Sequence, residues 1–256
     1  MQIKLLRIIL MLSILISLSN AQCMKKKLNV ENIIRTAILC EPQDLISPMP
    51  LVLVYHGRGG SAKDMFGTGL HKEWPEALVL YMDGLKGNPA PYDPKGKKAG
   101  WQINTGDMGD RDLRFSDAVL RVLFNNYKID IKKIFVVGHS NGSRFGALLW
   151  ATSGEMFKGF AFSASQADTL IGQVKSNNIF MGMGREDNLI KFDRQKMSIK
   201  YAINRFDMTL EKDIKKGVKL YKDKNGKKLL SYIHDGGHIW PKEQTKDIVK
   251  FFKSLE

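Results

Sequence analysis

Five short apolar runs constrain the fold of this chain more than any other feature. They span residues 51–55, 77–82, 133–137, 157–162 and 179–183, and most are followed by a glycine turn. Continuous apolar runs of this length are typical of strands that are buried on both faces, as in a parallel sheet. Residues 35–41 are predicted as a further strand.

Helix-like stretches alternate with these runs, at residues 111–127, 143–151, 192–206 and 242–255. Strands that alternate with helices predict an α/β fold, with a mostly parallel central sheet flanked by helices, as a single domain over 22–256. Two segments remain outside this pattern. Residues 84–110 form a long loop of the kind that often serves as a binding loop or lid. Residues 219–234 predict a hairpin that turns at Asn225-Gly226.

The first 21 residues have the layout of a secretory signal peptide. Lys4 and Arg7 precede an apolar run over 8–18, and Ala21 ends a short stretch of small residues. We expect cleavage after Ala21 and a secreted or periplasmic protein. The apolar run is too short for a transmembrane helix, so none is expected in the mature chain.

Two cysteines, Cys23 and Cys40, leave two questions open. Cys23 raises a lipoprotein alternative, although Asn20 and Gln22 suit the usual lipobox poorly. In an oxidising compartment the two thiols either pair or remain as a terminal thiol and a buried strand cysteine. Paired cysteines at metal-binding spacing are absent from the sequence, and its isolated acids are typical of a surface, so we expect no metal and no cofactor.

The chain is strongly basic, with 40 Lys+Arg against 26 Asp+Glu and a formal charge of +14. Such a charge invites a nucleic-acid interpretation. No recognised nucleic-acid-binding module is present, and export argues against such a partner. Part of the charge is local, because residues 212–228 carry eight lysines against Asp213 and Asp223. We expect either a solvated surface there or attraction to an anionic surface or polymer.

The sequence Gly138-His139-Ser140-Asn141-Gly142 follows the 133–137 run and precedes a helical stretch. This is G-x-S-x-G at a strand-to-helix turn, where the serine hydroxyl projects from the edge of the sheet. Glycine is expected at both ends because a side chain would clash in so tight a turn. Ser140 is therefore the candidate nucleophile.

A serine hydroxyl needs a base to remove its proton and an acid to orient that base. His238 lies after the last strand-like run and is the candidate base, whereas His234 is expected inside the strand. Asp187 follows the 179–183 run and is the candidate acid, with Glu186 and Asp193 nearby. The order Ser, Asp, His along the chain is the one that this kind of fold uses.

The oxyanion of an acyl-transfer intermediate needs preorganised N–H donors. One is expected from the backbone of Asn141, directly after the nucleophile. The other is expected from the backbone of Arg58 or Gly59, in the glycine-rich loop after the 51–55 strand.

These motifs together resemble the exported α/β-hydrolase esterases that include feruloyl esterases, acetylxylan esterases and polyhydroxybutyrate depolymerases. The resemblance runs from about residue 35 to the C-terminus, and one segment, Gly236-Gly237-His238-Ile239-Trp240-Pro241, is its most specific part. It is also carried by the segments Leu53–Ala62, Asp83-Gly84-Leu85, Gly100-Trp101, Gly138–Gly142 and Gly184–Asp187. Depolymerase-like members often carry a cysteine where this chain has Arg58, and no polymer-binding module is visible.

The resemblance implies an α/β-hydrolase fold, a triad of Ser140, Asp187 and His238, and Trp101 and Trp240 close to the site. We expect these two tryptophans and His56 to contact the substrate. The predicted function is an exported serine ester hydrolase acting on feruloyl or acetyl esters of plant polysaccharide. Hydrolysis of hydroxyalkanoate oligomers is an alternative, and an inactive envelope-binding protein with the same fold is another.

Overall fold

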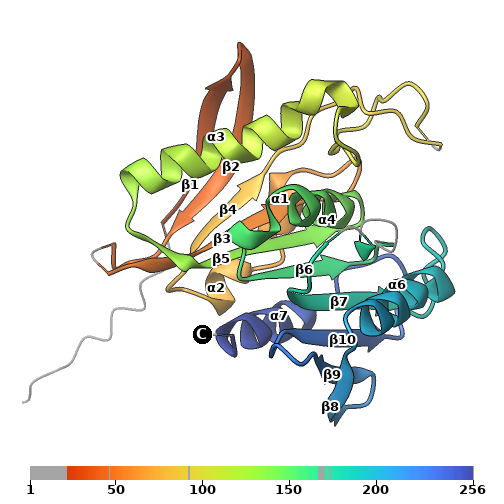
Figure 1. Ribbon diagram of the computed structural model, residues 1–256. Helices are drawn as coiled ribbons and strands as arrows, with labels where there is room; N and C mark the ends of the chain where they lie inside the picture. Colours follow the sequence, from red (N-terminus) through yellow and green to blue (C-terminus); the bar gives the residue numbers. More distant parts are fainter. Residues whose placement is uncertain (1–21, 46, 92, 167–170, 173, 256) are drawn as a thin grey trace, which may run out of the picture.

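A ten-stranded sheet runs through the molecule in the order β1-β2-β4-β3-β5-β6-β7-β10-β9-β8 (Figure 1). The computed structural model describes residues 22–255 except 46, 92, 167–170 and 173, so the expected signal peptide lies outside the described residues. The strands are β1 (Gln22–Val30), β2 (Ile33–Glu41), β3 (Met49–Tyr55), β4 (Leu78–Met82), β5 (Ile129–His139), β6 (Gly159–Ser163), β7 (Asn178–Gly184), β8 (Thr209–Lys215), β9 (Val218–Lys222) and β10 (Lys228–His234).

The centre of the sheet is parallel and both of its margins are antiparallel. Strands β4, β3, β5, β6, β7 and β10 pair in parallel. The β1–β2 pair and the β8–β9 pair are added to the two sides in the antiparallel sense. The predicted mostly parallel sheet is therefore confirmed, and every residue of β3, β4, β6 and β7 is buried.

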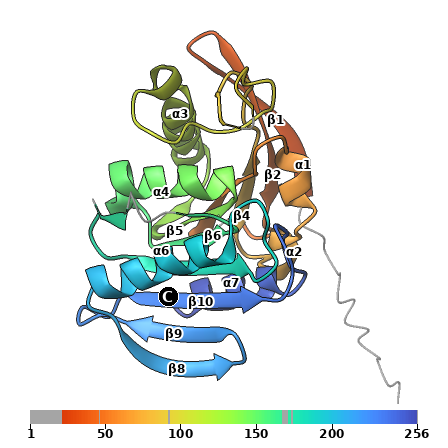
Figure 2. The same cartoon turned by 90° about the vertical axis from the view of Figure 1, so that its right-hand side faces the viewer.

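Helices cover both faces of the sheet, as Figures 1 and 2 show. One hydrophobic core lies under α3 (Arg111–Asn126), α4 (Asn141–Ser153) and α6 (Phe192–Arg205). The opposite core lies under α1 (Ala62–Phe66), α2 (Leu70–Glu73) and α7 (Gln244–Lys253). Two short 3₁₀ turns, η1 (Asp107–Asp110) and η2 (Gly154–Met156), connect these elements. None of the described helices combines the length and apolar character needed to cross a bilayer.

The local sequence explains how α3 is anchored. Phe115, Val119 and Leu123 recur every four residues and are buried, so one apolar stripe of the helix faces the sheet. Arg35 of β2 is also buried beneath it and forms an ion pair with Asp112 at 2.8 Å. The paired charges of Arg35 and Asp112 compensate each other inside the core.

The margins of the sheet differ from the expectations. The strands β1 and β8 were not predicted, whereas the hairpin of β9 and β10 is confirmed, with Gly226 in the left-handed region at φ 80°. Every residue of β8 is exposed, and β1 has three consecutive lysines. Edge strands of this kind lack the buried apolar run from which the central strands are recognised.

A disulfide joins Cys23 of β1 to Cys40 of β2, which face each other directly in the antiparallel register. The pairing question that the sequence left open is thus answered in the structure. The sulfur of Cys23 that a lipid anchor would need is bonded to Cys40.

The order in which the chain adds strands reverses between β3 and β5. From β3 the chain continues to β4 on one side, and it then returns to form β5 on the other side. In open α/β sheets, ligands bind outside the carboxyl ends of strands at such a reversal. The loop after β3 begins at His56 and the turn after β5 holds Ser140, so both segments lie at this point.

Candidate active site

Ser140 occupies a strained turn between β5 and α4. Its φ of 53° and ψ of −116° lie outside the regions that a non-glycine residue prefers. The turn is fixed by the Ser140 N–H, which donates to the carbonyl of Ser163 at 2.8 Å, and by the amide of Ser143, which donates to the Ser140 carbonyl at 3.0 Å. The Ser143 hydroxyl adds a bond to the Gly138 carbonyl at 2.8 Å.

The glycines of the turn are required by close backbone approaches. A Cβ on Gly142 would lie 2.2 Å from the carbonyl oxygen of Tyr55, and one on Gly138 would lie 2.5 Å from the Gly142 backbone. A Cβ on Gly57 would lie 3.3 Å from that of Ser140, so the loop after β3 passes directly against the candidate nucleophile. The expected steric reason for glycine in this motif is confirmed.

Asp187 and His238 are brought together by the loops after β7 and β10. Asp187 Oδ2 lies 2.8 Å from His238 Nδ1. The carboxylate is buried, while Glu186 and Asp193 are exposed, so Asp187 is the one of the three acids that meets the imidazole. His234 ends β10, and its Nδ1 accepts the N–H of Gly236 at 3.1 Å.

Three further donors hold the Asp187 carboxylate. The amides of Leu189 and Ile190 donate to Oδ1 at 2.9 and 2.8 Å. The side chain of Gln195 donates to Oδ2 at 2.9 Å from the second turn of α6, and Gln195 is 2% exposed. Sequence reasoning missed Gln195, because its part in the site depends on how α6 packs beside the loop rather than on a motif.

His139 lies between the turn that holds Ser140 and the side chain of His238. Its ring centroid lies 5.2 Å from that of His238 and 6.2 Å from that of Trp240. Burial, followed by the nearby His238, lowers the pKa of His139 to about 4, so the ring is neutral near pH 7. The hydrogen bonds among the described residues include none between His238 and Ser140, a contact that often tightens only when substrate is bound.

His56 is buried and joins two loops instead of facing a ligand. Its Nε2 accepts the N–H of Gly84 at 2.9 Å, which leaves Nδ1 to donate to the Gly57 carbonyl at 2.7 Å. Burial lowers the pKa of His56, in agreement with a neutral ring. The structure thus gives His56 a role in holding the loop after β3, in contrast to the expected substrate contact.

Trp101 is likewise fully buried. Its ring stacks on Phe145 at 5.4 Å between centroids, and its Nε1 donates to the carbonyl of His56 at 2.9 Å. The structure therefore does not support the expected contact between this ring and a substrate, because neither face of the ring is exposed. Trp240 is only partly buried, and its Nε1 donates to Thr245 at 2.9 Å.

Asn141 binds the backbone of Trp101 from the first turn of α4. Its Oδ1 accepts the Trp101 N–H at 2.7 Å and its Nδ2 donates to the Trp101 carbonyl at 3.1 Å. Gly100 has no side chain for a related reason, because a Cβ there would lie 2.7 Å from the Asn141 oxygen. Asn141, directly after the candidate nucleophile, thus connects the 84–101 segment to the turn that holds Ser140.

Of the two expected donors in the loop after β3, Gly59 is already engaged. Its N–H donates to the carbonyl of Ala99 at 2.7 Å, so it is not directed at an oxyanion. This corrects the expectation for Gly59. The backbone amide of Arg58 remains the candidate from this loop, together with that of Asn141, which starts α4 and has no carbonyl one turn earlier to bind.

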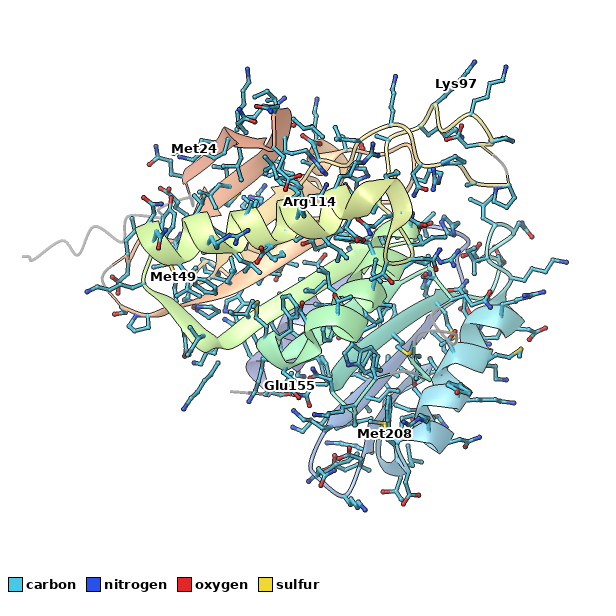
Figure 3. The ribbon with its side chains drawn as sticks, turned by 45° about the horizontal axis from the view of Figure 1, so that its top comes forward. Met24, Met49, Lys97, Arg114, Glu155 and Met208 are labelled. Atoms are coloured by element: carbon cyan, nitrogen blue, oxygen red, sulfur yellow. A yellow bond between two sulfur atoms is a disulfide. The ribbon has the colours of Figure 1, made fainter. Side chains whose placement is uncertain are left out.

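The side chain of Arg58 points away from Ser140 and contacts the 84–101 segment. It donates to the carbonyl of Asn88, and its guanidinium lies 3.7 Å from Asp93. Asp93 in turn accepts the amides of Lys97 and Lys98 at 2.9 and 3.0 Å, and these bonds, with Arg58, lower its pKa. Lys97 projects from the outer end of this segment (Figure 3).

One group of potential metal ligands occurs among the described residues. It consists of Cys23, Cys40 and His71, where the two sulfurs are joined to each other. It lies away from Ser140, on β1, β2 and α2.

The sequence is similar to two curated esterases over about half of the chain. "Putative esterase NocK" of Nocardia uniformis subsp. tsuyamanensis is 26% identical over 154 residues, or 56% of this chain and 42% of that protein. "Acetylxylan esterase" of Coprinopsis cinerea is 27% identical over 146 residues, or 54% of this chain and 36% of that protein. The chain thus spans less than half the length of these relatives. No protein-family model matches it.

Solved structures share the fold over most of the chain. A Bacillus cereus carboxylesterase has a TM-score of 0.61 at 15% identity, covering 87% of this chain and 95% of that one. An acetyl xylan esterase from Aspergillus awamori has a TM-score of 0.65 at 15% identity, covering 91% and 100%. A ferulic acid esterase has a TM-score of 0.63 at 12% identity, covering 93% and 99%. The α/β-hydrolase fold and the resemblance to esterases are confirmed.

Proposed function

We propose that this chain is an exported serine carboxylic ester hydrolase, in which residues 22–256 form one catalytic domain. The observation that carries the proposal is the 2.8 Å contact between Asp187 and His238, beside the strained turn that holds Ser140. The names of the curated relatives, both esterases, support the same activity.

In the acylation step, Ser140 Oγ attacks the ester carbonyl while His238 Nε2 takes its proton. Asp187 accepts the Nδ1–H of His238 and stabilises the imidazolium as it forms. The oxyanion is bound by the backbone N–H groups of Asn141 and Arg58. His238 then gives its proton to the departing alcohol oxygen, and the acyl group stays on Ser140.

Deacylation repeats these roles with water as the nucleophile. His238 removes a proton from the water, the hydroxyl attacks the acyl carbon, and Ser140 leaves with the proton from His238. The products are a carboxylic acid and the free enzyme, so the reaction needs no co-reactant besides water.

We propose feruloyl or acetyl esters of plant polysaccharide as the substrates. An acetylxylan esterase among the relatives and the acetyl xylan and ferulic acid esterases among the structural neighbours support this choice. Of the three aromatic side chains expected to contact the substrate, Trp101 and His56 are buried, whereas Trp240 is partly exposed and can contact a sugar or a phenolic acyl group.

The serine mechanism is tested with a fluorophosphonate probe on the mature chain and on Ser140→Ala. We expect labelling and p-nitrophenyl acetate hydrolysis for the wild type and neither for Ser140→Ala. An unlabelled but folded wild-type protein would support the inactive envelope-binding alternative.

The substrate is tested with methyl ferulate, acetylated xylan and hydroxybutyrate oligomers in parallel. Turnover of either of the first two supports the proposal. Turnover of the oligomers alone would contradict the proposed substrates and identify hydroxyalkanoate esters as the substrate class.

The export proposal is tested by expressing the full chain with its own leader. An N-terminus at Gln22 in the secreted or periplasmic fraction is expected. Membrane retention with a lipid on Cys23 would contradict it.

A further inference from the structure

A cavity of about 280 Å³ lies between α3 and the β1–β2 hairpin. Figure 3 shows the two elements that flank it, with Met24 labelled on β1 and Arg114 on α3, although neither of these residues lines the cavity. None of Ser140, Asp187 and His238 lines it. Its volume is close to the lower limit of small-molecule sites, which begin at about 300 Å³.

The cavity exists because a small residue occupies the middle of β2. Ala37 stands between the larger side chains of Arg35 and Leu39 on the face toward α3. Across the cavity, α3 contributes Val119 and Leu123. The wall is thus mostly aliphatic. An apolar group that moves from water into the cavity would therefore bury apolar surface without breaking hydrogen bonds of the protein.

The mouth of the cavity is basic. Lys26 lies opposite Ala37 in the β1–β2 register and alternates with Leu28 and Val30, which pack against the core under α3. No acidic residue is among those that line the cavity. Lys26 is exposed at the rim, and no ion pair within the described part of the chain involves it. Of the two other cations that line the cavity, Lys27 is exposed and Arg35 is buried and already paired with Asp112.

We propose that this cavity binds a single-chain anionic amphiphile, with its apolar tail between α3 and β2 and its carboxylate at Lys26. At about 30 Å³ for each water-sized group, the cavity holds a tail of roughly nine such groups, so a carboxylate of about eight carbons fits. The site is separate from the proposed ester hydrolysis and does not depend on it.

Octanoate is the probe, with 1-octanol as its neutral counterpart, and binding is measured by calorimetry below the micellar range. The protein is the mature chain carrying Ser140→Ala, which prevents turnover and removes the candidate nucleophile. We expect saturable binding of octanoate that is tighter than that of 1-octanol.

Three substitutions locate the ligand. Ala37→Leu fills the cavity and is expected to abolish binding. Lys26→Gln is expected to weaken octanoate binding up to about fivefold, the range for an exposed ion pair, and to leave 1-octanol unchanged. Lys25→Gln is the matched control, since Lys25 is the next residue of the same strand but does not line the cavity.

Val122→Phe, at the exposed rim of the cavity, serves as a second filling variant if Ala37→Leu does not fold. Absence of saturable octanoate binding overturns the proposal. If octanoate still binds to both filling variants, the ligand lies elsewhere and the proposal is wrong. If Lys25→Gln and Lys26→Gln weaken octanoate binding equally, the binding reflects general attraction to a basic surface, which also contradicts the proposal.

Discussion

At the scale of single residues, side chains near Ser140 position other groups of the candidate site. Gln195 is an example, because its amide is buried against Asp187 while His238 contacts the same carboxylate oxygen. The carboxylate keeps the amides of Leu189 and Ile190 when Gln195 is lost, so the orientation of the acid is weakened and not abolished.

Replacing Gln195 with Leu is expected to lower kcat/KM for p-nitrophenyl acetate by about 10- to 100-fold. This corresponds to the loss of one hydrogen bond to a charged group, about 1.5–3 kcal/mol. Lys196→Ala, on the next and exposed position of α6, is the control and should keep wild-type kinetics. A Gln195→Leu enzyme that is as active as the control would show that Asp187 needs no such support.

The pKa of His139 leads to a prediction about stability. It is lowered to about 4 by burial and by His238, whereas an unfolded histidine titrates near 6.5. Between these values the unfolded state binds the extra proton, so the free energy of unfolding falls as the pH is lowered from 6.5 to 4. The contribution of this residue is about 3 kcal/mol.

His139→Phe keeps a ring but cannot titrate, so it should flatten this dependence. The measurement is urea unfolding at half-unit steps from pH 7 to pH 4. His56, His71 and His234 also have lowered pKa values because of burial, so a smaller slope should remain. An unchanged slope in the variant would contradict a buried neutral His139.

Among the structural elements, the 84–101 segment and the loop after β3 form one unit. Arg58 extends from that loop to Asn88 and Asp93, and the N–H of Gly59 binds Ala99 in return. Asn141 holds the other end of the segment through Trp101. The backbone amide that we assign to the oxyanion thus sits in a loop whose position depends on a segment thirty residues further along the chain.

Arg58→Ala is therefore expected to lower kcat for small esters by at least tenfold, with labelling of Ser140 by the fluorophosphonate retained. The segment should also become more sensitive to limited proteolysis. Asp93→Asn is expected to give a smaller effect, and the double variant should not be additive, because both changes remove the same contact. Additive effects would contradict this coupling, and Lys97→Ala on the same segment is the neutral control.

The central parallel strands could be predicted from the sequence, whereas the edge strands β1 and β8 could not. The strands of the parallel centre are buried on both faces, so their apolar runs stand out in the sequence, and the order of Ser140, Asp187 and His238 follows from their position after β5, β7 and β10. The strand β1 has a lysine-rich sequence and acquires its structure by pairing with β2. The burial of Trp101 depends on contacts with Phe145 and His56 that no local pattern reveals.

Over the whole molecule, the disulfide between Cys23 and Cys40 fixes the first strand to the sheet. Reduction, or Cys23→Ser, should lower the free energy of unfolding by up to about 3 kcal/mol, the value for a loop of about this length. Thermal melts with and without a thiol reductant measure the difference. Cys23→Ser should not respond to the reductant, and a wild-type melt unaffected by it would contradict the stabilising role.

Both open margins of the sheet carry lysine, in β1 at one end and in β8 at the other. The strand β8 also departs from regular register at two points, between Leu210 and Lys212 and between Asp213 and Lys215. An uncharged, flat margin would offer unpaired amides and carbonyls to another molecule. The three lysines of β1 repel those of a second copy, so two molecules do not readily extend each other's sheets at that margin. At β8 the two lysines are balanced by Glu211 and Asp213, and the irregular register is what disfavours pairing with another strand. Salt screens the repulsion between β1 margins, so self-association through this strand should increase with ionic strength.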